Sequence, residues 1–120
     1  MKKVLVVDDE PDILDLTRMF LENEGYKVFT AGNSEEALKI VENMIPDIIL
    51  LDIVMSGFDG LETCEILKSN PITGDIPVIM FSALGREEDK AKSREAGACD
   101  YIIKPFSKET LLKKIKAHLG

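Results

Sequence analysis

Five polar side chains that could do chemistry together stand directly after apolar runs of this 120-residue chain. Asp8 and Asp9 follow one such run, and Asp52, Ser82 and Lys104 each follow another. Carboxylates, a hydroxyl and an ammonium group are a set that can hold a hard metal ion and accept a phosphoryl group. Their common position after apolar runs therefore indicates one shared site.

The charges of these residues predict a bound metal ion. Asp8, Asp9 and Asp52 would repel one another by on the order of 4 kcal/mol per pair at about 4 Å and an effective dielectric of about 20. Lys104 alone cannot neutralise three carboxylates. Because the motifs hold neither histidine nor cysteine, the oxygen-rich set suits Mg²⁺, which binds one or two carboxylates together with water and a phosphate.

A carboxylate in such a site can act as a nucleophile and form an aspartyl phosphate. We assign this role to Asp52, since it follows the most continuously apolar segment, Ile48–Leu51, and should be held most rigidly. Lys104 and Ser82 would then hold the phosphoryl oxygens. Pro105 restricts the backbone at Lys104, while the sequence leaves the isomer of the bond between them open.

Two kinds of segment alternate along the chain and would position these residues. Short runs that are apolar on both faces have the length and character of buried parallel strands. They span Lys3–Val7, Lys27–Ala31, Asp47–Leu51, Pro77–Phe81 and Cys99–Ile103. Amphipathic stretches with helix start signals lie between and after them. They begin at Pro11, at Ser34 and Ser107 as N-caps, after Asp59-Gly60, and near Glu87.

This alternation predicts an α/β fold, a doubly wound parallel sheet of five strands with five helices. The carboxyl ends of parallel strands meet at one edge, where such folds bind ligands. The length fits one domain, residues 1–120. The fourth helical stretch, Glu87–Ala96, has only two alanines to bury and should be among the least stable elements.

Composition excludes several function classes. With 15 basic and 22 acidic residues the net charge is −7, so we expect neither direct nucleic-acid binding nor binding to anionic membranes. The longest apolar runs have four residues, far below the ~20 of a membrane span. The acidic residues from Asp8 onward also end the first apolar run before a signal peptide could form. We therefore expect a cytoplasmic protein.

Three further features favour ordinary structural roles. Cys64 and Cys99 lie in apolar sequence without metal-ligand spacing and are expected to be buried, reduced thiols. His118 is expected on the surface, in the last helical turn, and not to be a phosphoacceptor. The lysines of the last helix are interpreted first as a solvated face and second as a dimer or acidic-partner surface. They are Lys108, Lys113, Lys114 and Lys116.

At these residues the chain resembles a response-regulator receiver domain, the phospho-accepting module of two-component signalling. The likeness covers residues 2–119. It rests on the segments Val6–Glu10, Leu51–Met55, Asp59-Gly60, Phe81–Ala83 and Lys104–Phe106, which match in order and spacing. The family implies a flavodoxin-like strand order of 2-1-3-4-5.

The resemblance implies that Asp52 accepts a phosphoryl group from a histidine kinase or a histidine phosphotransfer protein. Asp9 and Asp52 would ligate Mg²⁺ directly, together with the backbone carbonyl of Val54. Asp8 would act through water. By the same resemblance the protein is a switch of a phosphorelay and not an enzyme, beyond its own phosphorylation and dephosphorylation.

The resemblance also implies how the switch works. Ser82 and Lys104 would contact the phosphoryl group, and Tyr101 stands where the family carries an aromatic switch residue. We expect the change to be read out on the face formed by the fourth helix, the fifth strand and the fifth helix. The protein is expected to be a monomer or a weak dimer.

The chain departs from the family pattern at two places. Met55-Ser56-Gly57 stands where Met-Pro is usual, which should make that loop more flexible. Ser82 replaces a more frequent threonine and keeps the hydroxyl. In addition, Val54 and Leu84 are apolar at the two positions that help set dephosphorylation in the family, so we predict slow self-dephosphorylation.

Three other interpretations make different demands on the sequence. A metal-dependent aspartyl phosphatase would carry its nucleophile on the first strand in a DxD pattern, which Asp8-Asp9-Glu10 does not offer. A flavin or nucleotide binder needs a phosphate-cradling loop after the first strand, and the acidic loop opposes one. The third alternative, a receiver domain excised from a larger regulator with a DNA-binding or enzymatic output domain, remains open.

Overall fold

Strands and helices alternate along the described chain, except where two short strands directly follow the third main strand. The protein is represented by a computed structural model that describes residues 1–55 and 58–119. The main strands are β1 (Lys3–Val7), β2 (Lys27–Ala31), β3 (Ile48–Asp52), β6 (Val78–Ser82) and β7 (Asp100–Ile103). The helices are α1 (Pro11–Glu22), α2 (Ser34–Asn43), α3 (Gly60–Ser69), α4 (Glu87–Glu95) and α5 (Lys108–Leu119).

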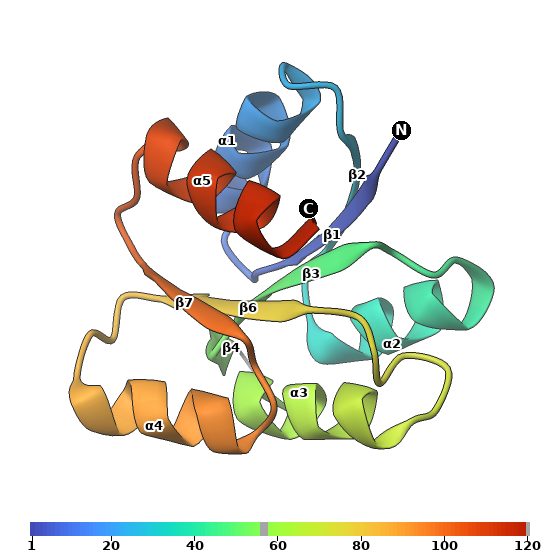
Figure 1. The fold of residues 1–120 in the computed structure, drawn as a ribbon, viewed down its shortest axis with the longest axis vertical. Coiled ribbons are helices and arrows are strands. Elements are labelled where there is room, and N and C mark those ends of the chain that lie inside the picture. The colour runs from blue at the N-terminus through green and yellow to red at the C-terminus, as the bar shows by residue number, and fades with distance from the viewer. Residues whose placement is uncertain (56–57, 120) are drawn as a thin grey trace.

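The main strands form one parallel sheet in the order β2-β1-β3-β6-β7. Two short strands, β4 (Val54–Met55) and β5 (Phe58–Asp59), make a separate antiparallel pair after β3. Apart from that pair, the sheet has the predicted order 2-1-3-4-5. Helices α1 and α5 cover one face, and α2, α3 and α4 cover the other (Figure 1). The predicted doubly wound fold is confirmed.

Each face of the sheet has its own apolar core. On one face, side chains of α2 and α3 such as Val41 and Leu67 pack on the strands. On the other, Leu21 of α1 and Leu111 and Ile115 of α5 do so. Because β3 is buried along its whole length between these layers, its carboxyl end is held firmly. No helix within the described ranges is long and apolar enough to cross a membrane.

Helix α4 differs from the other four helices. The residues that it buries are polar, Asp89 and Ser93. The hydroxyl of Ser93 donates to the Asp89 carbonyl, and the guanidinium of Arg86 donates to the Asp89 carboxylate at 2.9 Å. The helix therefore lacks a large apolar anchor, as the sequence indicated.

The expected N-cap of α2 was wrong, whereas that of α5 was right. The N-cap of α2 is Asn33, whose side chain accepts from the Glu36 amide at 2.8 Å, and not Ser34. Ser34 is fully buried and accepts a hydrogen bond from the Thr63 hydroxyl of α3. Its side chain is therefore committed to packing α2 against α3. At α5, by contrast, Ser107 accepts from the Thr110 amide as an N-cap should.

The two cysteines differ in exposure. Cys64 is buried as predicted, and burial raises the pKa of its thiol to about 11. Cys99 is exposed, which corrects the expectation of two buried thiols. It precedes β7, the outermost strand on its side of the sheet, so only part of its surroundings is covered.

Candidate functional site

The predicted site residues lie at the carboxyl ends of adjacent strands. Asp8 follows β1, Asp52 ends β3, Ser82 ends β6 and Lys104 follows β7. The register places Asp52 opposite Phe81, one residue before Ser82. The Lys104 amide donates to the Ser82 carbonyl at 2.8 Å. The parallel ladder thus brings together residues that are far apart in the sequence.

Lys104 lies at the centre of the site. Its Nζ is 2.5 Å from Oδ2 of Asp8, 3.2 Å from Oδ2 of Asp52 and 3.6 Å from Oε1 of Glu10. The side chain is 9% exposed, and Nζ stands 4.9 Å from the centroid of the Phe81 ring. The peptide bond from Lys104 to Pro105 is cis. One ammonium group therefore serves three carboxylates.

The electrostatics of the site are dominated by burial and by the crowding of carboxylates. Burial and, second, the charge of Asp8 raise the pKa of Asp52 from 3.8 to about 6, against the opposing effect of Lys104. Burial alone would lower the pKa of Lys104, but the hydrogen bond to Asp8 and the charge of Asp52 raise it. At neutral pH Asp52 is thus mostly ionised beside a charged lysine, and the cluster keeps an excess of negative charge.

Four carboxylates can share one cation at this edge. One oxygen each of Asp8, Asp9, Glu10 and Asp52 lies within 4.8 Å of the others. Asp8 and Asp52 are buried, whereas Asp9 and Glu10 are exposed. Hard oxygen donors without histidine or cysteine fit Mg²⁺, and the exposed pair leaves a path from solvent.

Glu10 was not among the predicted site residues, although its place directly after Asp8-Asp9 was the signal that could have found it. Gly60 is a second residue whose positional role was missed. A Cβ at Gly60 would collide with the carbonyl oxygen of Asp52 and lie 2.8 Å from Cα of Ile53. Only glycine lets the start of α3 come this close to the end of β3.

Ser82 and Tyr101 are linked through the backbone of Leu84. The Leu84 amide donates to Oγ of Ser82 at 3.1 Å, and the Tyr101 hydroxyl donates to the Leu84 carbonyl at 2.5 Å. The Tyr101 ring is half-buried against the core on the α2–α3–α4 side. A displacement of the β6–α4 loop would therefore change the hydrogen bonds of both side chains.

Val54 stands at the edge of the site. Its amide donates to Oδ1 of Asp52 at 3.2 Å, and its side chain is 60% exposed. The nearby departure from the family pattern at Met55-Ser56-Gly57 falls on Ser56 and Gly57, which lie outside the described residues.

His118 is partly buried, whereas a position on the surface was expected. Its Nε2 lies 2.9 Å from Oδ2 of Asp100, and its side chain is 25% exposed. The contact joins the last turn of α5 to the first residue of β7, on the sheet edge away from Asp52.

Comparison with known proteins gives a family for this arrangement. The family model described as the response regulator receiver domain matches residues 4–116. Two curated relatives are the phosphate regulon transcriptional regulatory protein PhoB of Pseudomonas aeruginosa, 42% identical, and the alkaline phosphatase synthesis transcriptional regulatory protein PhoP of Bacillus subtilis, 43% identical. The match covers 98% of this chain but only 52% and 48% of those proteins, so the chain spans about half their length.

Solved structures agree over nearly the whole chain. The chemotaxis protein CheY4 of Vibrio cholerae superposes with a TM-score of 0.95 at 32% identity, covering 99% of both chains. A CheY-like receiver domain protein of Methanospirillum hungatei gives a TM-score of 0.92 at 36% identity, covering 99% of this chain and 94% of that one. On these grounds the chain belongs to the family of response regulator receiver domains, the signalling switches of two-component systems.

Proposed function

We propose that Asp52 accepts a phosphoryl group from a histidine kinase or a histidine phosphotransfer protein. The observation that carries this proposal is the contact of buried Asp52 with Lys104 beside a second buried carboxylate, Asp8. With a pKa of about 6, Asp52 is ionised and nucleophilic at neutral pH. One of its oxygens forms a bond to phosphorus while the bond from phosphorus to the donor's imidazole nitrogen breaks, and that nitrogen keeps the electron pair.

Lys104 and Ser82 then stabilise the modified state. A phosphoryl group on Asp52 adds roughly −1.5 to −2 of charge. Lys104, already held between Asp8 and Asp52, is placed to turn its ammonium group toward the new oxygens, and the Ser82 hydroxyl is placed at the next strand end. These contacts exist only after phosphorylation, which is the differential interaction that a two-state switch requires.

Mg²⁺ is the cofactor that the donor set suits. We propose that Asp9, Asp52 and the backbone carbonyl of Val54 hold it, with Asp8 acting through water. Bound there, the cation would supply neutralisation of the charge that develops on the transferred phosphoryl oxygens. The protein's own part is to present Asp52 ionised and to keep Lys104 protonated beside it.

The test compares wild type, Asp52→Asn and the matched control Asp75→Asn, which removes an exposed carboxylate in the α3–β6 loop. Each protein is incubated with acetyl phosphate, with and without Mg²⁺, and its intact mass is measured. Wild type and Asp75→Asn should gain one phosphoryl group only with Mg²⁺, and Asp52→Asn should gain none. Equal labelling of Asp52→Asn would refute the assignment.

The signal is proposed to leave the site through Leu84 and Tyr101 to the face of α4, β7 and α5. Movement of Ser82 toward the phosphoryl group would pull on the Leu84 amide and release or turn the Tyr101 ring, which is bonded to the same residue. Helix α4 can shift readily because it lacks a large apolar anchor. Hydrogen exchange with and without beryllofluoride should change most in α4, and unchanged exchange there would contradict this route.

The lifetime of the phosphoryl group is proposed to be long. Neither Val54 nor Leu84 has a side chain that can orient an attacking water by hydrogen bonding. Val54→Asn and Leu84→Glu should therefore shorten the lifetime of the labelled protein several-fold, measured by decay of the intact-mass signal. Loss of the label from wild type within seconds would contradict the proposal.

The biological context is proposed from the relatives. The chain spans about half of two transcriptional regulatory proteins. We infer that residues 1–120 form one phospho-accepting domain, which passes its signal to an output domain or to a separate target protein. It would do so in the cytoplasm, as a monomer or weak dimer, without itself binding nucleic acid. Light scattering of the chain, with and without beryllofluoride, tests whether it is a monomer or a weak dimer.

A further inference from the structure

Three exposed isoleucines gather in a groove between α2 and α3. Ile45, Ile66 and Ile72 are 44%, 52% and 70% exposed, and Leu38 and Val41 also line the groove. The other exposed large apolar side chains of the described residues are distributed over α1, β4, β7 and the N-terminus. Contiguous exposed apolar surface marks interaction sites, whereas single exposed apolar residues are normal.

Carboxylates lie at the edge of this groove and in the hollow next to it. Glu42 is the one charged residue among those described as lining it. On the solvent side of α3, Glu62 and Glu65 stand beside Ile66 in an adjoining hollow that has no basic residue among its described lining. An apolar groove with an anionic rim complements a ligand that is apolar on one side and cationic on the other.

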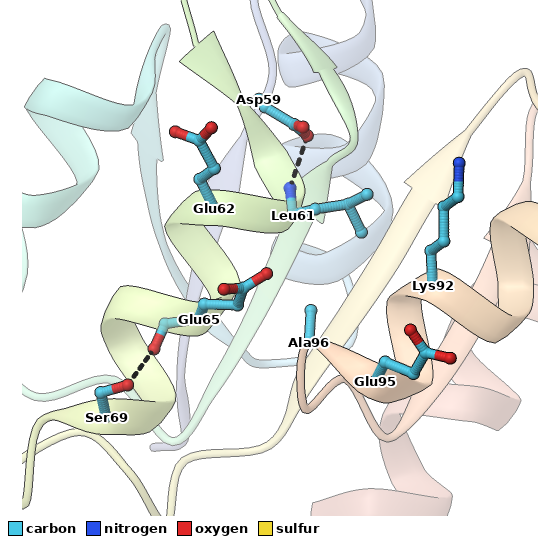
Figure 2. A pocket seen from close by; sticks show the side chains of 8 residues that line it. All are labelled: Asp59, Leu61, Glu62, Glu65, Ser69, Lys92, Glu95 and Ala96. Carbon is cyan, nitrogen blue, oxygen red and sulfur yellow. Dashed lines mark hydrogen bonds between the residues drawn. The ribbon is translucent and has the colours of Figure 1, made fainter.

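The acidic surface continues past α3. Figure 2 shows the cleft between α3 and α4, with Glu62 and Glu65 on α3, Glu95 on α4 and Lys92 as the cation drawn there. Glu62 and Glu65 thus border both hollows. From α2 to α4 the surface changes from apolar to acidic across the single ridge of α3.

We propose that this surface is a docking site for a cationic amphipathic helix of a partner protein. Its apolar side chains would fill the groove around Ile45, Ile66 and Ile72, and its lysines or arginines would lie on Glu62 and Glu65. A second copy of this chain is disfavoured, since a symmetric contact would set the carboxylates of one rim against those of the other. Anionic lipid is disfavoured for the same electrostatic reason.

The apolar groove is separate from the phosphoacceptor site, whereas Glu62, in the first turn of α3, lies toward the Asp52 edge and borders a hollow that Val54 also lines. Ile45 precedes β3 and Ile72 precedes β6, so the groove opens at the amino edge of the sheet, opposite the edge that carries Asp52. Docking in the groove itself would leave Asp52 and Lys104 uncovered, and the inference does not depend on the proposed phosphorylation.

The test uses a synthetic helix of about 15 leucines and lysines with one apolar face, and a matched peptide with glutamate in place of lysine. Each is titrated into ¹⁵N-labelled full chain. We expect amide shifts centred on Ile45, Ile66 and Ile72. The glutamate peptide should bind at least about tenfold more weakly, as should the lysine peptide to Ile66→Ser or to Glu65→Lys.

Met19→Ser is the matched control, because Met19 is 51% exposed on α1, on the other face of the sheet. It should bind the lysine peptide within about twofold of wild type. The spectra also show whether each variant is folded, and Glu65→Lys changes an exposed position only. Shifts confined to the Asp52 edge, equal binding of both peptides, unchanged binding by Ile66→Ser and Glu65→Lys, or self-association without peptide would each overturn the proposal.

Discussion

Asp52, at the carboxyl end of β3, and Asp100, at the amino end of β7, differ in the direction of their electrostatic balance. Asp52 contacts one ammonium group beside another buried carboxylate, and its pKa is raised to about 6, chiefly by burial and then by Asp8. Asp100 lies 2.8 Å from Lys114 and 2.9 Å from His118. Burial would raise its pKa too, but the hydrogen bonds from Lys114 and His118 lower it.

The number of cations per carboxylate explains the difference. Asp100 has two cationic or donor side chains to itself, so its charge is satisfied within the fold and its role is to join β7 to α5. Asp52 shares Lys104 with Asp8 and Glu10, so the folded state retains repulsion among these carboxylates, which an added cation can relieve. An aspartate that the fold leaves undercompensated is the better candidate for chemistry.

The largest expected effect is the change in the free energy of unfolding when Asp52 is replaced by asparagine. Because the folded pKa is raised, the folded state binds the extra proton between the unfolded value of 3.8 and about 6, and stability falls as pH rises through that window. In the absence of metal, Asp52→Asn should therefore raise the free energy of unfolding at pH 7 by up to about 3 kcal/mol. The gain should fade as pH falls below about 4.

Urea unfolding across that pH range measures this effect. Asp75→Asn, at an exposed position, should change the free energy of unfolding by no more than about 0.5 kcal/mol at any pH. An Asp52→Asn variant less stable than wild type at neutral pH would show that the carboxylate is compensated after all, and the contrast with Asp100 would fail.

Mg²⁺ should relieve the same excess charge. A cation that binds only the folded state raises the free energy of unfolding by about 1.4 kcal/mol at ten times its dissociation constant. Wild type should show this increase in urea unfolding at pH 7, whereas Asp52→Asn and Asp9→Asn should show little or none. If Mg²⁺ in a Ca²⁺-free buffer left the free energy of unfolding of wild type unchanged, the metal assignment would be wrong.

The fold and the meeting of the main site residues follow from the sequence for one physical reason. Strands that are apolar on both faces are typical of parallel sheets covered by helices on both sides, and parallel strands bring their carboxyl ends to one edge. The predicted segment Asp47–Leu51 is shifted by one residue from β3, because Asp52 still pairs with Phe81 in the ladder. The site residue is thus part of the strand and not of the loop.

Contacts set by the return path of a helix were not predictable from local sequence. α5 runs back along β7, so its last turn meets the first residue of that strand, and His118 reaches Asp100 across 18 positions. Likewise, Ser34 and Asn33 are both good N-caps by type, and only the buried contact of Ser34 with Thr63 decides between them.

The smallest expected effect concerns the Asp100 side of the comparison. Lys114 and His118 lower the folded pKa of Asp100. The contribution of Asp100 to the free energy of unfolding is therefore fully present above its unfolded pKa and is lost as pH falls through the folded pKa. This pH dependence is opposite in sign to that of Asp52. Lys114→Met should lower the free energy of unfolding at pH 7 by about 0.5–1 kcal/mol, since the pair is partly exposed and screened.

Lys113→Met on the same helix is the matched control, since Lys113 is exposed and should tolerate the change within about 0.5 kcal/mol. Urea unfolding of both variants at pH 7, and again in acid where Asp100 is protonated, separates charge from packing. A loss in Lys114→Met that persists undiminished in acid would mean that the lysine stem stabilises the helix by apolar contact. Asp100 would then owe its low pKa to His118 and the Tyr101 amide, and the ratio of cations to carboxylates would no longer distinguish the two aspartates.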